Sequence, residues 1–186
     1  MSQPPPLSPE TVLRGYFHAK DENRPHVLAR VFALDANLTV INNAINIEFP
    51  AQTNGQEAIA EVLVSRFNQT YENIYSFYLA SPPTRASAFS CDWLVGMTEK
   101  ESKNVRVGCG RYDWTFQAAS PHLASRLVVT IEVMQLLPAS QFGPVFSWLQ
   151  QLNYPWSSTA QVKGLAPNVQ LLAPVLQYVA RNDDGV

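Results

Sequence analysis

Long segments in which bulky apolar side chains alternate with small or polar ones fill the second half of the first 137 residues. Each is bounded by polar, Gly- or Pro-containing turns, which is typical of β-strands. These predicted strands are 11 to 14 residues long, so we expect bulges or bends within them; they cover 88–98, 105–117 and 124–137. A shorter strand, NIYSFYL at 73–79, precedes them, and a loop that contains Pro82-Pro83 separates it from the first long strand.

Three helices are predicted before these strands. Ser8 is followed by Pro9 and an acid, which is typical of a capped helix start, and the helix should run to about Lys20. A second, short helix should begin at Pro25, and a third at Asn54, where an Asn precedes an acid by three residues. The side chains expected to face inward are Val12, Leu13, Tyr16, Phe17, Val27, Leu28, Val31, Phe32, Ile59, Val62, Leu63 and Phe67.

Two short strands are predicted between the second and third helices. Residues 34–37 form a turn that leads into LTVIN at 38–42. Asn42-Asn43 then leads to a second strand, INIEF at 45–49, which Pro50 closes and confines to the edge of a sheet.

Helices followed by a run of antiparallel strands indicate an α+β fold. We expect a curved, mixed but mainly antiparallel sheet, wrapped by the three N-terminal helices into a cone with one mouth. The expected organisation is a Pro-rich arm at 1–7, the cone at 8–137 and a helical extension at 138–186, with helices at about 142–152 and 167–180. The extension is too apolar to be a solvated tail, so it should dock on its own domain, on the cone mouth or on a partner subunit.

The hairpin around 99–104 sets a register in which paired residue numbers add up to about 203. Trp93 then lies opposite Gly110, where the missing side chain leaves room for the indole, and Cys91 lies opposite Tyr112. These residues share one aromatic pleat face with Phe89, Val95, Gly108, Trp114 and Phe116. That face either lines a cavity beneath the helices or simply fills the core.

The other face of the hairpin pairs Asp92 with Arg111 and places Asp113, Thr130 and Glu132 close to them. This arrangement favours a cross-strand ion-pair network on the outside of the sheet, with catalysis by these residues as the alternative.

The composition of the chain argues against several classes of function. A net charge of −2 and a pI near 5.9 give no basic surface for nucleic acid, and no apolar run approaches the roughly 18 residues of a membrane span. With two cysteines and no secretory signal, we expect a cytoplasmic protein. No metal-ligand spacing and no phosphate-binding loop is present, so no cofactor is expected. Cys91 and Cys109 fall on opposite faces in the register, which predicts two free, buried thiols.

Residues 10–137 resemble the nuclear transport factor 2-like superfamily, also described as SnoaL-like or cystatin-like cone proteins. The residues that carry the resemblance are Tyr16 on the first helix, the turn from Phe32 to Leu38, the helix start Gly55-x-Glu57-Ala58-Ile59, and the alternation of Tyr112, Trp114 and Phe116. The superfamily includes steroid isomerases, dehydratases, epoxide hydrolases, polyketide cyclases and many non-enzymes, so it does not fix a function.

The steroid isomerases give the most specific comparison. Their helix-one tyrosine, a donor to the developing enolate oxygen, corresponds to Tyr16, and their second donor falls on Tyr112. Their general-base aspartate falls on Val40, which cannot accept a proton, so their proton transfer is not supported here. The dehydratases need a pocket aspartate with histidines, and the three histidines of this chain, His18, His26 and His122, are expected on helix surfaces or loops.

Two functions remain open from the sequence. One is binding or processing of a small apolar, cyclic molecule in the cone, oriented by Tyr16 and Tyr112. The other is a non-catalytic dimerisation or scaffold module with a filled cone. The residues expected to contact a ligand are Tyr16, Phe32, Val40, Phe49, Cys91, Trp93, Tyr112 and Trp114; Tyr16, Tyr112 and Asp92 are the candidates for catalysis. The resemblance implies a homodimer, which we expect through the outer sheet face, where Leu94, Val107 and Val128 lie among the charges.

Overall fold

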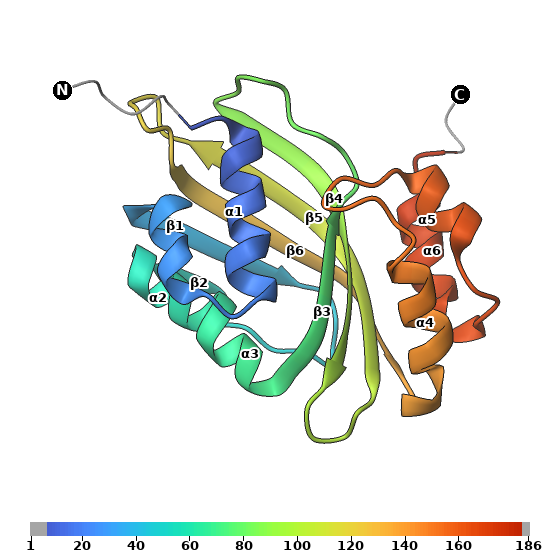
Figure 1. The fold of residues 1–186 in the computed structure, drawn as a ribbon. Helices are drawn as coiled ribbons and strands as arrows, with labels where there is room; N and C mark the ends of the chain where they lie inside the picture. The colour runs from blue at the N-terminus through green and yellow to red at the C-terminus, as the bar shows by residue number, and fades with distance from the viewer. Residues whose placement is uncertain (1–6, 184–186) are drawn as a thin grey trace.

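A computed structural model describes residues 7–183. Its core is one sheet of six strands in the order β2-β1-β6-β5-β4-β3, in which β1 and β6 are parallel and the other pairs are antiparallel. The fold is α+β, as predicted. Figure 1 shows helices α1 to α3 on one side of the curved sheet and α4 to α6 on the other.

The bounds of the elements show where the predictions hold. The strands are β1 (Phe32–Asn42), β2 (Gln52–Asn54), β3 (Tyr71–Tyr78), β4 (Ala88–Glu99), β5 (Val105–Phe116) and β6 (Ala124–Leu137). The N-terminal helices are α1 (Pro9–Asp21), the 3-10 helix η1 (Pro25–Arg30), α2 (Gln56–Ala60), the π-helix η2 (Glu61–Arg66) and α3 (Phe67–Thr70). The C-terminal helices are η3 (Ala139–Gln141), α4 (Phe142–Leu149), α5 (Thr159–Leu165), η4 (Gln170–Leu172) and α6 (Ala173–Ala180).

The first helix is confirmed, including its cap: the Ser8 hydroxyl accepts a hydrogen bond from the Thr11 amide at 3.2 Å. The predicted Asn54 cap of the third helix is wrong. Gly55 is the residue before α2, at a φ of 90°, and it provides no side-chain cap. The Asn54 side chain instead accepts a hydrogen bond from Asn37 across the β1–β2 pair.

The predicted turn at 34–37 is also wrong, because β1 already begins at Phe32. The pairing of β1 with β6 shifts register between Phe32 and Asn37, so these residues form an irregular part of the strand rather than a separate turn. Leu34 consequently points outward and is 82% exposed.

The predicted strand at 45–49 does not exist, and residues 43–51 have no regular secondary structure. Asparagine side chains replace a backbone ladder here. Asn42 Nδ2 donates to the carbonyl of Ile47 at 2.6 Å, and Asn46 Nδ2 donates to the carbonyl of Met134 at 2.8 Å. Because side chains already satisfy these carbonyls, alternation of apolar residues alone was not enough to make a strand.

The predicted register of the central hairpin is confirmed over its whole length. Trp93 pairs with Gly110, Cys91 with Tyr112, and every pair from Ala88 to Thr98 follows the same sum. The expected irregularity lies in the neighbouring pair, where β5 and β6 shift register between Cys109 and Gly110.

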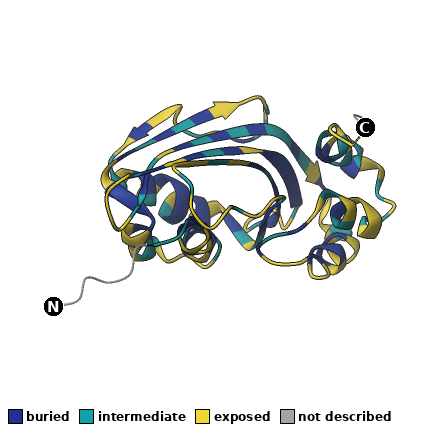
Figure 2. Ribbon diagram, turned by 90° about the horizontal axis from the view of Figure 1, so that it is seen from above, coloured by how far each residue is buried: buried dark blue, intermediate teal, exposed yellow. Residues whose placement is uncertain are grey.

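The sheet separates two apolar cores. The larger one fills the cone between the concave face and the helices α1 to α3, and contains the aromatic residues of β4 and β5. The smaller one lies on the other face, between the sheet and the C-terminal helices. Figure 2 shows the buried residues on the strands and on the helix faces turned toward them.

The C-terminal extension packs on the outer sheet face of its own chain. Val145, Trp148 and Val175 share the second core with Leu94 and Val107 of the sheet. The extension also covers the edge of β3. Tyr78 donates its amide to the carbonyl of Pro155 at 2.8 Å and accepts from the Ser157 amide at 2.9 Å, which protects an open strand edge. The sequence predicted two helices in this region and missed α5.

Candidate functional site

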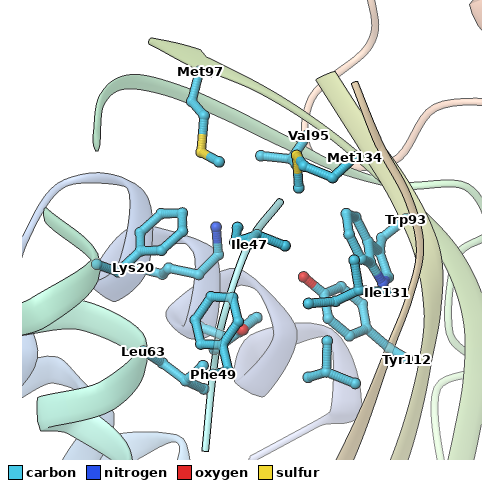
Figure 3. A pocket seen from close by; sticks show the side chains of 13 residues that line it. Lys20, Ile47, Phe49, Leu63, Trp93, Val95, Met97, Tyr112, Ile131 and Met134 are labelled. Atoms are coloured by element: carbon cyan, nitrogen blue, oxygen red, sulfur yellow. The ribbon is translucent and has the colours of Figure 1, made fainter. Parts of the chain in front are cut away.

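A small cavity of about 50 Å³ lies inside the cone, between helix α1 and the aromatic face of the sheet. Figure 3 shows its walls: side chains of β4, β5 and β6 on one side, and Lys20, Leu63 and Phe49 on the other. Ile47 and Phe49 come from the irregular segment 43–51, so one wall is built by a part of the chain outside the regular elements.

Tyr16 and Tyr112 form the polar part of the cavity wall. Both side chains are buried, and their rings meet edge to face with centroids 5.8 Å apart. Burial raises the pKa of both hydroxyls. Both tyrosines therefore stay neutral at pH 7, and a neutral phenol hydroxyl can donate a hydrogen bond.

Trp93 is positioned by the glycine opposite it. Its ring stacks on Tyr112 at 5.6 Å, and a Cβ atom added at Gly110 would lie 2.9 Å from the Trp93 ring. The same Cβ atom would lie 1.9 Å from the carbonyl oxygen of Thr130. The indole N–H of Trp93 is buried, with no hydrogen-bond partner among residues 7–183.

Lys20 places a buried cation at the cavity wall. Its ammonium donates to Asp21 Oδ1 at 2.6 Å and to Ser76 Oγ at 2.7 Å. Asp21 also accepts from the amide and the hydroxyl of Ser76, at 3.1 and 2.9 Å. Burial raises the pKa of Asp21, and the contacts with Lys20 and Ser76 oppose that rise by stabilising the carboxylate.

Sequence reasoning found part of this cavity. Of the eight residues expected to contact a ligand, Tyr16, Phe49, Trp93 and Tyr112 line it. The other four, Phe32, Val40, Cys91 and Trp114, are buried in the surrounding core and do not line it.

Lys20 was missed as a site residue. The signal that could have found it is its spacing from Tyr16, since residues four apart share one face of a helix.

The charged pairs on the outer face differ from those expected. Arg111 contacts Asp113 at 3.0 Å, whereas Asp92 forms two bonds with Arg181 of the extension, at 2.7 and 2.9 Å. Thr130 does lie opposite Arg111, but Glu132 accepts from Asn43. Asp92 is therefore on the opposite side of the sheet from the cavity, where it anchors the C-terminal helix α6.

The two thiols are free and buried, as predicted. Burial raises the pKa of Cys91 and of Cys109 to about 12. Because the thiolate is the reactive form, we expect neither thiol of the folded protein to react with a disulfide reagent within minutes at pH 8. Both should react in denaturant. Fast labelling of one thiol in the native protein, followed by absorbance, would contradict the burial described here.

Within the described residues, no group of three or more His, Cys, Asp or Glu side chains is placed to hold a metal ion. No helix in the same range is both long and apolar enough to cross a membrane.

Comparison with known proteins identifies the architecture. No protein-family model and no curated protein matches the sequence. Solved structures do match. One is a nuclear transport factor 2-like superfamily protein from Salmonella enterica serovar Typhimurium, at 13% identity and a TM-score of 0.53; the match covers 67% of this chain and 88% of that one. The chain has the nuclear transport factor 2-like fold.

Two further solved structures that are similar to this chain have a known ligand or a named activity. One is a hypothetical protein with a ketosteroid isomerase-like fold from Catenulispora acidiphila, in complex with trimethylamine, at 15% identity and a TM-score of 0.52, covering 66% of this chain and 85% of that one. The other is a hexachlorocyclohexane dehydrochlorinase, at 16% identity and a TM-score of 0.52, covering 68% and 84%. Nuclear transport factor 2-like proteins thus include small-molecule binders and enzymes, and roughly a third of this chain lies outside each of these matches.

Proposed function

We propose that the cone binds a small molecule, and that the molecule presents a hydrogen-bond acceptor to the Tyr16–Tyr112 pair. The observation that carries this proposal is the make-up of the cavity wall. It is apolar apart from the side chains of Tyr16, Lys20, Trp93 and Tyr112. Indole and ammonium groups only donate hydrogen bonds, and the neutral hydroxyls of Tyr16 and Tyr112 can donate as well. A ligand that supplies the acceptor would satisfy these donors.

The size of the cavity limits the ligand to a few non-hydrogen atoms. Its volume of about 50 Å³ is far below the few hundred cubic ångströms typical of ligand pockets. It is also about a third of the ~150 Å³ cavity that holds benzene in an engineered protein. The cyclic ligand expected from the sequence therefore does not fit unless the wall formed by Ile47 and Phe49 moves.

Binding is better supported than turnover. Val40, at the position of the steroid isomerase base, is a buried aliphatic side chain, and Asp92 lies on the other side of the sheet. Asp21, next to the cavity residue Lys20 in the chain, is already held by Lys20 and Ser76. No free general base thus faces the cavity from the residues considered for catalysis.

The small volume also favours a second candidate, a non-catalytic module with a filled cone. Much of the aromatic face is packed ring against ring: Trp114 stacks with Phe116 at 6.3 Å and with Phe32 at 5.8 Å. The homodimer stays a prediction. The apolar surface available for a dimer interface is smaller than expected, because the extension covers Leu94 and Val107. The Arg111–Asp113 pair remains exposed, and it offers a positive and a negative charge to a two-fold partner.

The Tyr16→Phe variant tests the binding proposal with acetamide, a small amide, as the probe. We expect the wild-type protein to show saturable shifts in its tryptophan indole N–H resonances, and the variant to bind more weakly by about 0.5–1.5 kcal/mol, the net contribution of one neutral hydrogen bond. Tyr154→Phe is the matched control, because Tyr154 is exposed on the extension and should leave binding unchanged. Absence of any saturable shift in the wild-type protein would favour the filled cone instead.

A further inference from the structure

Lys20 and Tyr16 reach the same cavity from one helix. They are four residues apart on α1, so their side chains lie on the same face. Figure 3 shows the Lys20 side chain extending toward Ile47, with its nitrogen at the open middle of the view, across from the hydroxyl of Tyr112. The cavity wall therefore carries the ammonium group of Lys20 and, across from it in this view, the hydroxyl of Tyr112; Tyr16 also lines the cavity.

The hydrogen-bonding capacity of Lys20 is only partly used. An ammonium group has three donors, and two of them go to Asp21 and Ser76. The ammonium also lies 5.2 Å from the ring centre of Phe67 and 5.5 Å from that of Phe17. These ring faces hold the cation in the apolar wall without accepting its third N–H as a full hydrogen bond.

The acceptors around Lys20 are occupied by the protein itself. The Asp21 carboxylate accepts hydrogen bonds from the Lys20 ammonium and from the amide and the hydroxyl of Ser76. The Ser76 hydroxyl in turn accepts a hydrogen bond from Lys20. No carboxylate side chain lines the cavity. A cationic ligand would face the ammonium group of Lys20 with no carboxylate in the cavity wall to bind it.

We propose that Lys20 is a ligand-binding residue and that the ligand is a small carboxylate, held between the Lys20 ammonium and the Tyr16 hydroxyl. A carboxylate has two oxygens, which match two donors on one helix face, whereas a ketone or an aldehyde has one. Hydrogen bonds from a cation to a carboxylate are also about twice as strong as neutral ones. This inference rests on the proposed function, and adds to it the class of the ligand and the residue that selects it.

The test compares three probes of similar size: acetate, acetamide and trimethylammonium. Each is titrated into the wild-type protein at pH 7 and constant ionic strength, and binding is followed by the indole and backbone N–H resonances. We expect acetate to bind at least tenfold more tightly than acetamide, and trimethylammonium not to bind. Acetamide binding as tightly as acetate, or trimethylammonium binding more tightly, would overturn the carboxylate assignment and leave the small-ligand function standing. Failure of all three probes would remove both.

Two variants identify the residue responsible. Replacing Lys20 alone would leave Asp21 buried without its cation, which threatens the fold. The double variant Lys20→Met with Asp21→Asn removes both charges at similar volume and should abolish the preference for acetate over acetamide. Asp21→Asn alone leaves the Lys20 cation without its carboxylate, so this variant is also less stable. If it folds, acetate is the counter-charge that Lys20 lacks, and acetate binding should tighten several-fold.

The fold of each variant is checked by its dispersed amide spectrum before titration. A folded double variant that keeps the acetate preference would show that Lys20 does not bind the ligand. Unchanged acetate affinity in a folded Asp21→Asn variant would place acetate away from Lys20.

Discussion

Gly110→Ala is expected to destabilise the protein by about 3 kcal/mol, at the upper end of the cost of overpacking a core. The added methyl group would meet the backbone carbonyl of Thr130 at 1.9 Å and the Trp93 ring at 2.9 Å. Backbone atoms in a sheet cannot move aside as a flexible side chain can, so β5 and β6 would have to separate at their register shift. Urea unfolding of the variant and the wild type measures the difference.

Gly143→Ala is the matched control for this change. Gly143 lies in α4, and a Cβ atom there meets nothing within 4 Å. Alanine is the better helix former, so this variant should be unchanged or more stable by up to about 1 kcal/mol. Equal stability of Gly110→Ala and wild type would show that Gly110 does not position Trp93.

Trp148→Ala is expected to cost about 3–5 kcal/mol of stability, which is the usual range for removing a large buried aromatic side chain. Trp148 is 1% exposed, lies in the core between the extension and the sheet, and donates its indole N–H to the carbonyl of Val162 at 3.1 Å. It therefore joins α4 to α5 as well as to the sheet. The loss should appear in a single unfolding transition, because the extension shares its core with the strands of the cone.

Tyr154→Ala removes a large side chain from the same extension at an exposed position, and should cost far less. A Trp148→Ala protein that unfolds in two steps, with the cone as stable as in the wild type, would show that the extension is an independent appendage. That outcome would contradict the shared core described here.

The pairing of the central strands could be predicted because it depends on residues that are close together in the sequence. One polar turn at 99–104 sets the register of β4 and β5, and a glycine opposite a tryptophan supports it. The strand expected at 45–49 failed because Asn42 donates to the carbonyl of Ile47 and Asn46 donates to the carbonyl of Met134 in β6. These side-chain bonds replace backbone pairing, and a period-two pattern does not reveal them. The helix α5 carried a usable signal in Ser158, whose hydroxyl caps the amide of Gln161 at 3.1 Å, but Pro155 and the flanking aromatics obscured it.

The site was only half predictable for a related reason. The positions of Tyr16, Trp93 and Tyr112 follow from a helix stripe and a strand register, both of which are periodic. The partner of Asp92 is Arg181, 89 residues away, and no local pattern connects them. The volume of the cavity depends on how Ile47, Phe49 and the aromatic rings fill the cone together, so packing rather than sequence spacing decides it.

A crystal structure of the protein soaked with acetate, and of a second crystal soaked with acetamide, tests the ligand site most directly. We predict density for a small molecule inside the cone, with an oxygen atom within hydrogen-bond distance of the Tyr16 hydroxyl. In the acetate crystal, a second oxygen should lie close to the Lys20 ammonium. Side chains packed through the cavity, with neither molecule bound at saturating concentration, would contradict it.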